Sequence, residues 1–184
     1  MAVNFTTAQV IDKENDGFTL FLQSGFNVLD TKEREVFTQG KGTKTTDLKG
    51  DEVEFTIHFE TIGSFFVIPS YFALGLGSGI DMDIKEDYYS VPVFLDARLF
   101  LFDYYHSPYL YVDYGGFLDL GGKYNRGVLL NFGAGVSVPT NSDVSIVLDA
   151  KYSLRVLSLT GEKVSTSDDT ITYKGWIISI GLRF

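Results

Sequence analysis

The chain contains no cysteine and only 4 prolines among its 184 residues. The absence of cysteine excludes a disulfide framework, a thiolate nucleophile and a zinc site built on cysteine. Cationic residues are also scarce, because 15 Lys and Arg stand against 24 Asp and Glu, for a formal net charge of −9. A chain with this balance has no basic stripe with which to neutralise phosphates, so we expect no nucleic-acid partner.

Neither a membrane-spanning helix nor a signal peptide is predicted. The stretch 61–80 carries no charge and is long enough to span a bilayer as a helix, but it contains Pro69 and four glycines. Proline and glycine are the weakest helix formers, which argues against a helix there. The first residues lead directly into polar sequence, so for an exported protein we expect the mature form with an added methionine.

The sequence does contain eight runs in which apolar and polar residues alternate. A period of two is the pattern of a strand with one apolar face. The last run, GWIISIGLRF, places five large apolar residues on one face and Gly, Ile, Ser, Gly and Arg on the other. The apolar positions of the eight runs fall within 18–28, 53–59, 72–80, 91–101, 110–118, 128–138, 144–156 and 176–184.

The size of the apolar side chains indicates that they face outward. The interior of an eight-stranded barrel is just wide enough for side chains to fill, and the Phe, Leu, Ile, Tyr and Trp of these runs would overfill it. Runs of about 10–14 residues also suit strands that cross a hydrocarbon layer at a tilt. The predicted connections alternate between short (62–64, 106–108, 139–142) and long (29–50, 81–87, 119–126, 159–170).

We therefore predict an all-β fold: an eight-stranded antiparallel up-and-down transmembrane β-barrel. The whole chain, 1–184, forms this single domain, and residues 1–16 are a short N-terminal extension. The opposite, inward face of the runs mixes glycine with charges of both signs. The predicted lumen network consists of Glu54, Glu60, Asp96, Arg98, Asp113, Asp149, Lys151, Arg155 and Arg183.

The chain resembles the small outer-membrane β-barrel proteins of Gram-negative bacteria, a porin-like family. The resemblance covers about Gly17 to Phe184, and its carriers are YFALGLGSGID (71–81), VPVFLDARLFLFDYYHSPYLYVDYGG (91–116) and the terminal GLRF. It implies the bacterial outer membrane as location, membrane lipid and the barrel-assembly machinery as partners, and a monomer. It also implies an insertion signal formed by Trp176, Ile178, Ile180, Leu182 and Phe184.

No catalytic residue, metal site or cofactor is predicted. The glycine clusters at 75–79 and 133–135 lack the following helix of a phosphate loop. We expect these glycines to make room for large neighbours such as Tyr71, Phe100 and Tyr111. The acidic stretch 81–87 matches no calcium loop and is read as a solvated hairpin tip. His58 and His106 are assigned to inner strand ends, as members of hydrogen-bond networks.

Three functions remain open at this stage. In the first, a non-enzymatic barrel with a plugged lumen carries surface loops for recognition or adhesion, with an extracellular partner at 29–50 and 159–170. In the second, the inward charges line a narrow channel for ions or small solutes. In the third, the apolar face points inward and the protein is a soluble, lipocalin-like binder of an apolar ligand.

Overall fold

The structure is a computed structural model that describes residues 15–38, 42–47, 55–83, 88–104, 107–118, 124–140, 143–159 and 167–184. In these residues no helix is long and apolar enough to cross a membrane. The regular elements are strands, namely β1 (Phe18–Thr38), β2 (Gly42–Asp47), β3 (Phe55–Ile68), β4 (Phe72–Asp83), β5 (Tyr88–Ser90), β6 (Pro92–Phe100), β7 (Pro108–Phe117), β8 (Tyr124–Pro139), β9 (Ser145–Leu159) and β10 (Ser167–Arg183).

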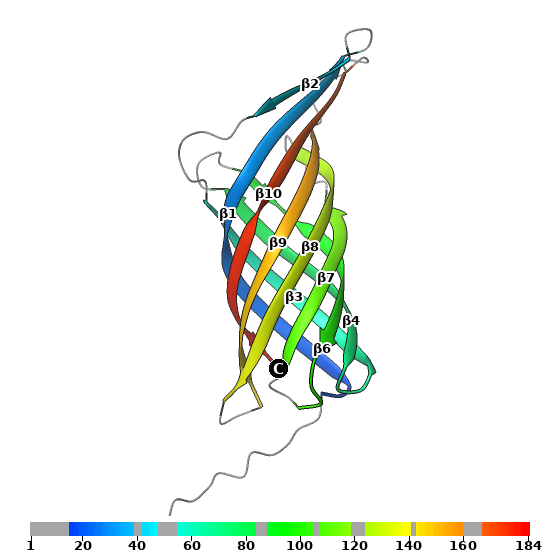
Figure 1. The fold of residues 1–184 in the computed structure, drawn as a ribbon, viewed down its shortest axis with the longest axis vertical. Coiled ribbons are helices and arrows are strands. Elements are labelled where there is room, and N and C mark those ends of the chain that lie inside the picture. The colour runs from blue at the N-terminus through cyan, green and yellow to red at the C-terminus, as the bar shows by residue number, and fades with distance from the viewer. Residues whose placement is uncertain are drawn as a thin grey trace, which may run out of the picture.

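The strands form a closed antiparallel barrel (Figure 1). Eight strands make the wall in the order β1, β3, β4, β6, β7, β8, β9 and β10, and β10 pairs back onto β1 to close it. The short strands β2 and β5 pair with β1 and β4 at one end of the barrel, called here the β2 end. The opposite end, where the chain terminates, is called the C-terminal end. The predicted fold class is confirmed.

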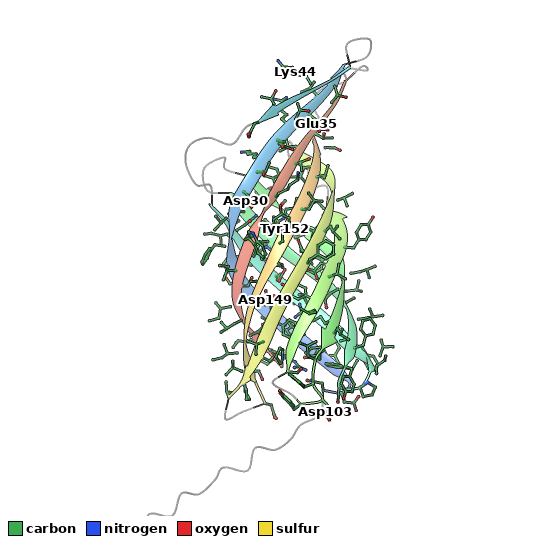
Figure 2. The ribbon with its side chains drawn as sticks, viewed as in Figure 1. Asp30, Glu35, Lys44, Asp103, Asp149 and Tyr152 are labelled. Atoms are coloured by element: carbon green, nitrogen blue, oxygen red, sulfur yellow. The ribbon has the colours of Figure 1, made fainter. Side chains whose placement is uncertain are left out.

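The two faces of the wall are arranged as predicted. Phe132, Leu148 and Ile180 are 56%, 46% and 59% exposed on the outside, whereas Asp149 and Arg98 are 5% and 0% exposed in the lumen. Figure 2 shows side chains standing out from the wall along the whole barrel. The apolar-inward arrangement of a lipocalin is therefore wrong for this chain.

One predicted turn is wrong. The sequence placed a short connection at 62–64, but β3 continues through these residues to Ile68, and the hairpin turn lies at 69–71. Thr61 and Gly63 occupy outward positions of β3 and interrupt the alternation of its apolar face. In the observed turn, Ser70 adopts a positive φ of 67°.

Several predicted connections also contain strand. β1 runs far beyond Val28, to Thr38, and β2 lies within the predicted connection 29–50. β10 begins at Ser167, inside the predicted connection 159–170. The upper parts of β10, β1 and β2 form a three-stranded sheet that rises above the other strands (Figure 1).

Candidate functional site

The lumen of the barrel contains a set of buried charged residues. Of the nine residues predicted to line it, Glu54 lies outside the described residues. The other eight are between 0% and 6% exposed, and all occupy inward positions of the wall: Glu60, Asp96, Arg98, Asp113, Asp149, Lys151, Arg155 and Arg183. Charges buried to this degree need partners, since an isolated one costs several kcal/mol.

Toward the β2 end, five side chains form an ionic cluster that crosses the lumen. Arg155 Nη1 lies 2.6 Å from Asp81 Oδ2, and Lys151 Nζ lies 2.6 Å from Glu60 Oε2. His58 joins the two pairs, with Nε2 2.7 Å from Glu60 Oε2 and Nδ1 in contact with Asp81 Oδ1. We call these five residues the upper ionic cluster.

In the middle of the lumen, two aspartates accept hydrogen bonds from neutral groups. Asp113 accepts a bond of 2.8 Å from the Asn131 amide, and Lys151 Nζ lies 3.9 Å from it. Asp149 accepts bonds from the Gln23 amide at 2.7 Å and from the hydroxyls of Tyr111 and Tyr109 at 2.9 Å and 3.3 Å. The middle layer thus connects β1, β7, β8 and β9.

Toward the C-terminal end, two arginines are packed among aromatic rings. Arg98 donates from Nε to both oxygens of Asp96 at 3.0 Å, and its guanidinium carbon lies 4.0 Å from the centre of the Phe21 ring. The Arg183 guanidinium lies 5.2–5.7 Å from three ring centres, those of Phe21, Phe66 and Phe100. Such cation–π contacts strengthen where water is excluded. We call this set, with Tyr109, the lower aromatic cluster.

The segment before β1 closes the C-terminal end of the lumen. Asn15 is fully buried there and its side chain accepts a bond of 2.7 Å from Arg183 Nη2. The Asn15 amide donates to the Tyr104 carbonyl at 3.1 Å, and its own carbonyl accepts from the Ser70 backbone N–H at 2.6 Å. Three separate parts of the chain are therefore joined at this point.

Two members of the upper ionic cluster correct the sequence analysis. Asp81 was placed in a solvated hairpin tip, but it lies in β4, faces the lumen and is 2% exposed. His58 was placed at the inner end of its strand, but it lies close to the start of β3 and pairs with Asp81, beside β5 at the β2 end. The acidic neighbours of Asp81 obscured its place in the inward alternation, which continues from Gly75, Gly77 and Gly79. His106 lies outside the described residues.

Three aromatic members of the lower aromatic cluster, Phe21, Phe66 and Tyr109, were not predicted. Phe100 and Tyr111 were expected inside and are buried, whereas Tyr71 was expected inside and is 45% exposed. The inward alternation of β1 and β7 was the available signal for Phe21 and Tyr109, but both lie among apolar neighbours. Alternation separates two faces poorly where both carry aromatic residues.

Three of the inward glycines, Gly77, Gly133 and Gly135, make room for rings, whereas Gly75 and Gly79 lie against Ser64 and Glu60. A Cβ on Gly133 would lie 2.3 Å from the Tyr111 ring, and one on Gly77 would lie 2.2 Å from the Phe94 ring. Because real Cβ atoms do not approach so closely, these rings can fill the lumen only where the paired residue of the neighbouring strand has no side chain.

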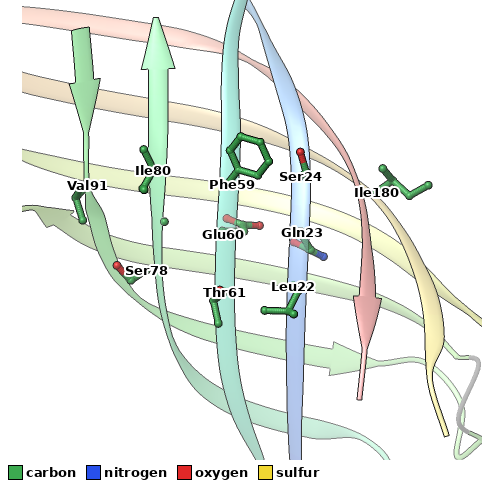
Figure 3. A pocket seen from close by; sticks show the side chains of 11 residues that line it. Leu22, Gln23, Ser24, Phe59, Glu60, Thr61, Ser78, Ile80, Val91 and Ile180 are labelled. Atoms are coloured by element: carbon green, nitrogen blue, oxygen red, sulfur yellow. The ribbon is translucent and has the colours of Figure 1, made fainter.

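A hollow of about 640 Å³ lies on the outer wall, across β1, β3 and β4 (Figure 3). The small residues Ser24, Thr61, Ser78 and Gly79 line it together with Gln23 and Glu60, and larger apolar side chains surround them: Leu22, Phe59, Ile80, Val91 and Ile180. The Ser78 hydroxyl donates to the carbonyl of Pro92 at 3.0 Å. The hollow is a shallow depression in the apolar surface.

The predicted insertion signal also lies on the outside. Its five residues, 176, 178, 180, 182 and 184, are between 42% and 59% exposed on the outward face of β10 and just beyond it. Their role in insertion stays a prediction. The described residues contain no group of His, Cys, Asp and Glu arranged as a metal site.

Comparison with known proteins relates the chain through its fold. No protein-family model and no curated protein matches the sequence. The barrel is similar to the crystal structure of the outer membrane protein OprG from Pseudomonas aeruginosa, with a TM-score of 0.57 and 13% identity over 94% of this chain and 97% of that one.

The barrel is also similar to the outer membrane protein AlkL, solved by solid-state NMR in lipid bilayers, with a TM-score of 0.52 and 17% identity. That match covers 100% of this chain and 96% of the other. At these identities, the two likenesses establish the shared barrel fold.

Proposed function

We propose that this chain is a non-enzymatic, integral outer-membrane barrel with a plugged lumen and a surface-exposed sheet for recognition or adhesion. The single observation that carries the plug is the burial of the lumen charges. Arg98, Asp113 and Lys151 are each 0% exposed, although they sit at the centre of a barrel rather than in a solid core. Because no surface of these side chains is accessible to water, their burial supports a lumen without a continuous aqueous path.

The exterior supports placement in a membrane. In lipid, every backbone group needs a partner within the protein, and a closed barrel provides this. The outward residues are apolar along the wall, and aromatic side chains stand near the barrel ends, where interfacial girdles occur. At the C-terminal end, the Phe102 and Tyr104 rings stack at 5.2 Å, and Phe102 is 48% exposed.

The sheet formed by β2 and the upper parts of β1 and β10 supports a role at the cell surface. Residues 43–47 of β2 are exposed and polar, so they suit water rather than lipid. Lys44 and Glu35 project from this sheet above the barrel wall (Figure 2). We infer that partners meet the protein at this sheet and at the connections within 29–50 and 159–170.

Planar-bilayer conductance tests the plug against the channel. We expect the purified protein, reconstituted near neutral pH, to show no stable unit steps. A variant that removes side chains from both halves of the lumen, Arg98→Ala and Tyr109→Ala below and Glu60→Ala and Lys151→Ala above, is expected to conduct, which proves that the assay detects an open barrel. Unit steps in the unaltered protein that change with Asp113→Asn would overturn the plug and establish the channel.

A further inference from the structure

His58 is enclosed by two carboxylates inside the lumen. Its Nε2 lies 2.7 Å from Glu60 Oε2 on the same strand, and its Nδ1 contacts Asp81 Oδ1 on the neighbouring strand β4. The ring is 2% exposed, so water does not separate these groups. Both ring nitrogens therefore face oxygen atoms of acidic side chains.

This geometry favours the doubly protonated ring. A neutral imidazole has one N–H and one lone pair, so one of its nitrogens would direct a lone pair at a carboxylate oxygen. The imidazolium has two N–H donors, and each then meets an acceptor. With ionised carboxylates, the observed contacts are satisfied when His58 carries a positive charge.

The charges around the ring agree with this state. Strand β9 contributes Lys151 and Arg155, β3 and β4 contribute Glu60 and Asp81, and β7 contributes Asp113, 3.9 Å from Lys151. The neighbouring inward positions of β1 and β5, Asn27 and Ser90, are uncharged. Two carboxylates, those of Glu60 and Asp81, thus touch the ring, and each of them is also paired with one cation of β9.

The upper ionic cluster joins opposite walls of the barrel. Glu60 and Asp81 belong to β3 and β4, whereas Lys151 and Arg155 belong to β9, which is three wall positions from β3 and four from β4 around the closed barrel. We propose that His58 is a proton-binding site whose occupancy holds this half of the lumen closed. When the proton leaves, one carboxylate loses its donor and faces a lone pair, and the contact across the lumen loosens.

This inference rests on the proposed plug, and two measurements distinguish a failure of the proton site from a failure of the plug. The first is the nitrogen spectrum of the imidazole in folded, selectively labelled protein. We expect two ring N–H groups for His58 at neutral pH, identified by their absence from His58→Gln. A single protonated ring nitrogen at neutral pH would overturn the proton site whether or not the barrel conducts.

The second measurement is planar-bilayer conductance between about pH 6 and about pH 10, a range that extends to either side of the point where an ordinary imidazole loses its proton. Because the lower aromatic cluster closes the other half of the lumen, this measurement and its histidine variants use the Arg98→Ala, Tyr109→Ala protein as the background. The background is expected to be silent at the acidic end and to show openings at the alkaline end, at least about tenfold more often. His58→Lys keeps a cation over most of this range and should stay silent, while His58→Gln should open throughout. His106→Gln changes the second histidine of the chain and serves as the matched control.

The outcomes are distinct. If the unaltered protein conducts near neutral pH, the plug itself is wrong. If the background variant conducts at the acidic end or is silent at every pH, or if His58→Lys opens with pH as the background does, the role of His58 is wrong. Heat-modifiable gel mobility shows that each variant has folded before it is scored.

Discussion

At the scale of single residues, Lys151 lies close to two carboxylates of the lumen. Its ammonium group lies 2.6 Å and 2.8 Å from the two oxygens of Glu60 and 3.9 Å from Asp113, and it is 0% exposed. Removal of one partner from a buried ion pair leaves an uncompensated charge. This typically costs about 3–5 kcal/mol.

We expect Lys151→Met to lower the free energy of unfolding by about that amount, measured by urea unfolding in lipid vesicles. The matched control is Lys174→Met, because Lys174 pairs with Glu33 at 3.9 Å where both side chains are 37% exposed. An exposed pair contributes about 0–1 kcal/mol. Equal losses in the two variants would contradict the importance of the buried pair.

The faces of these residues could be predicted from the sequence, but their partners could not. Alternation placed Asp149 in the lumen, where it accepts from Gln23, Tyr109 and Tyr111. Which side chains meet depends on the offset between strands on opposite walls. That offset accumulates around the whole barrel, and no local pattern in the sequence encodes it.

At the scale of elements, the pairing of β1 with β10 closes the barrel. Gly25 lies on this seam, and a Cβ there would be 2.3 Å from the carbonyl oxygen of Ile178 and 2.7 Å from the Ser179 hydroxyl. The first contact is with backbone, so it cannot be relieved by a rotamer change. An added methyl group therefore forces the two strands apart.

We expect Gly25→Ala to destabilise the closed barrel by about 1–3 kcal/mol, the usual cost of overpacking. Gel mobility of unheated samples over a temperature series measures this as a lower temperature at which the compact form is lost. Gly63→Ala is the control, since its Cβ would approach the outward Phe18 ring at 3.3 Å and that ring is 69% exposed. A seam variant as heat-resistant as the control would show that the seam tolerates the methyl group.

Strand ends were harder to predict than strands. The apolar face of β3 is broken by Thr61 and Gly63, so the sequence indicated a turn where the strand continues to Ile68. The upper halves of β1 and β10, which pair with each other, carry mostly polar residues on both faces, although Lys32 and Ile171 are buried. With few apolar residues on either face, the alternation that reveals a strand is weak there.

At the scale of the whole molecule, a single reporter tests which medium surrounds the barrel. Trp176 is the one tryptophan of the chain, and it is 51% exposed on the outward face, against Tyr152. In bilayers we expect lipids with brominated acyl chains to quench its fluorescence strongly, while aqueous iodide has little effect. Trp176→Phe gives the background signal.

The opposite pattern, strong quenching by iodide and little by brominated lipid, would place the outer wall in water and refute the membrane orientation. That orientation was predictable because it depends on bulk properties of the chain: the volume of the apolar side chains against the width of an eight-stranded lumen. The prediction of this orientation did not require knowledge of which side chains pack together.

The length of β1 has a mechanical consequence. This strand extends over 21 residues, from the C-terminal end of the wall to the tip of the three-stranded sheet, and it pairs with β10 over most of that length. A molecule that pulls on the tip loads this seam lengthwise, so many backbone bonds share the force and none is peeled first. A force applied to the tip is therefore transmitted through the β1–β10 pairing to the C-terminal end of the barrel.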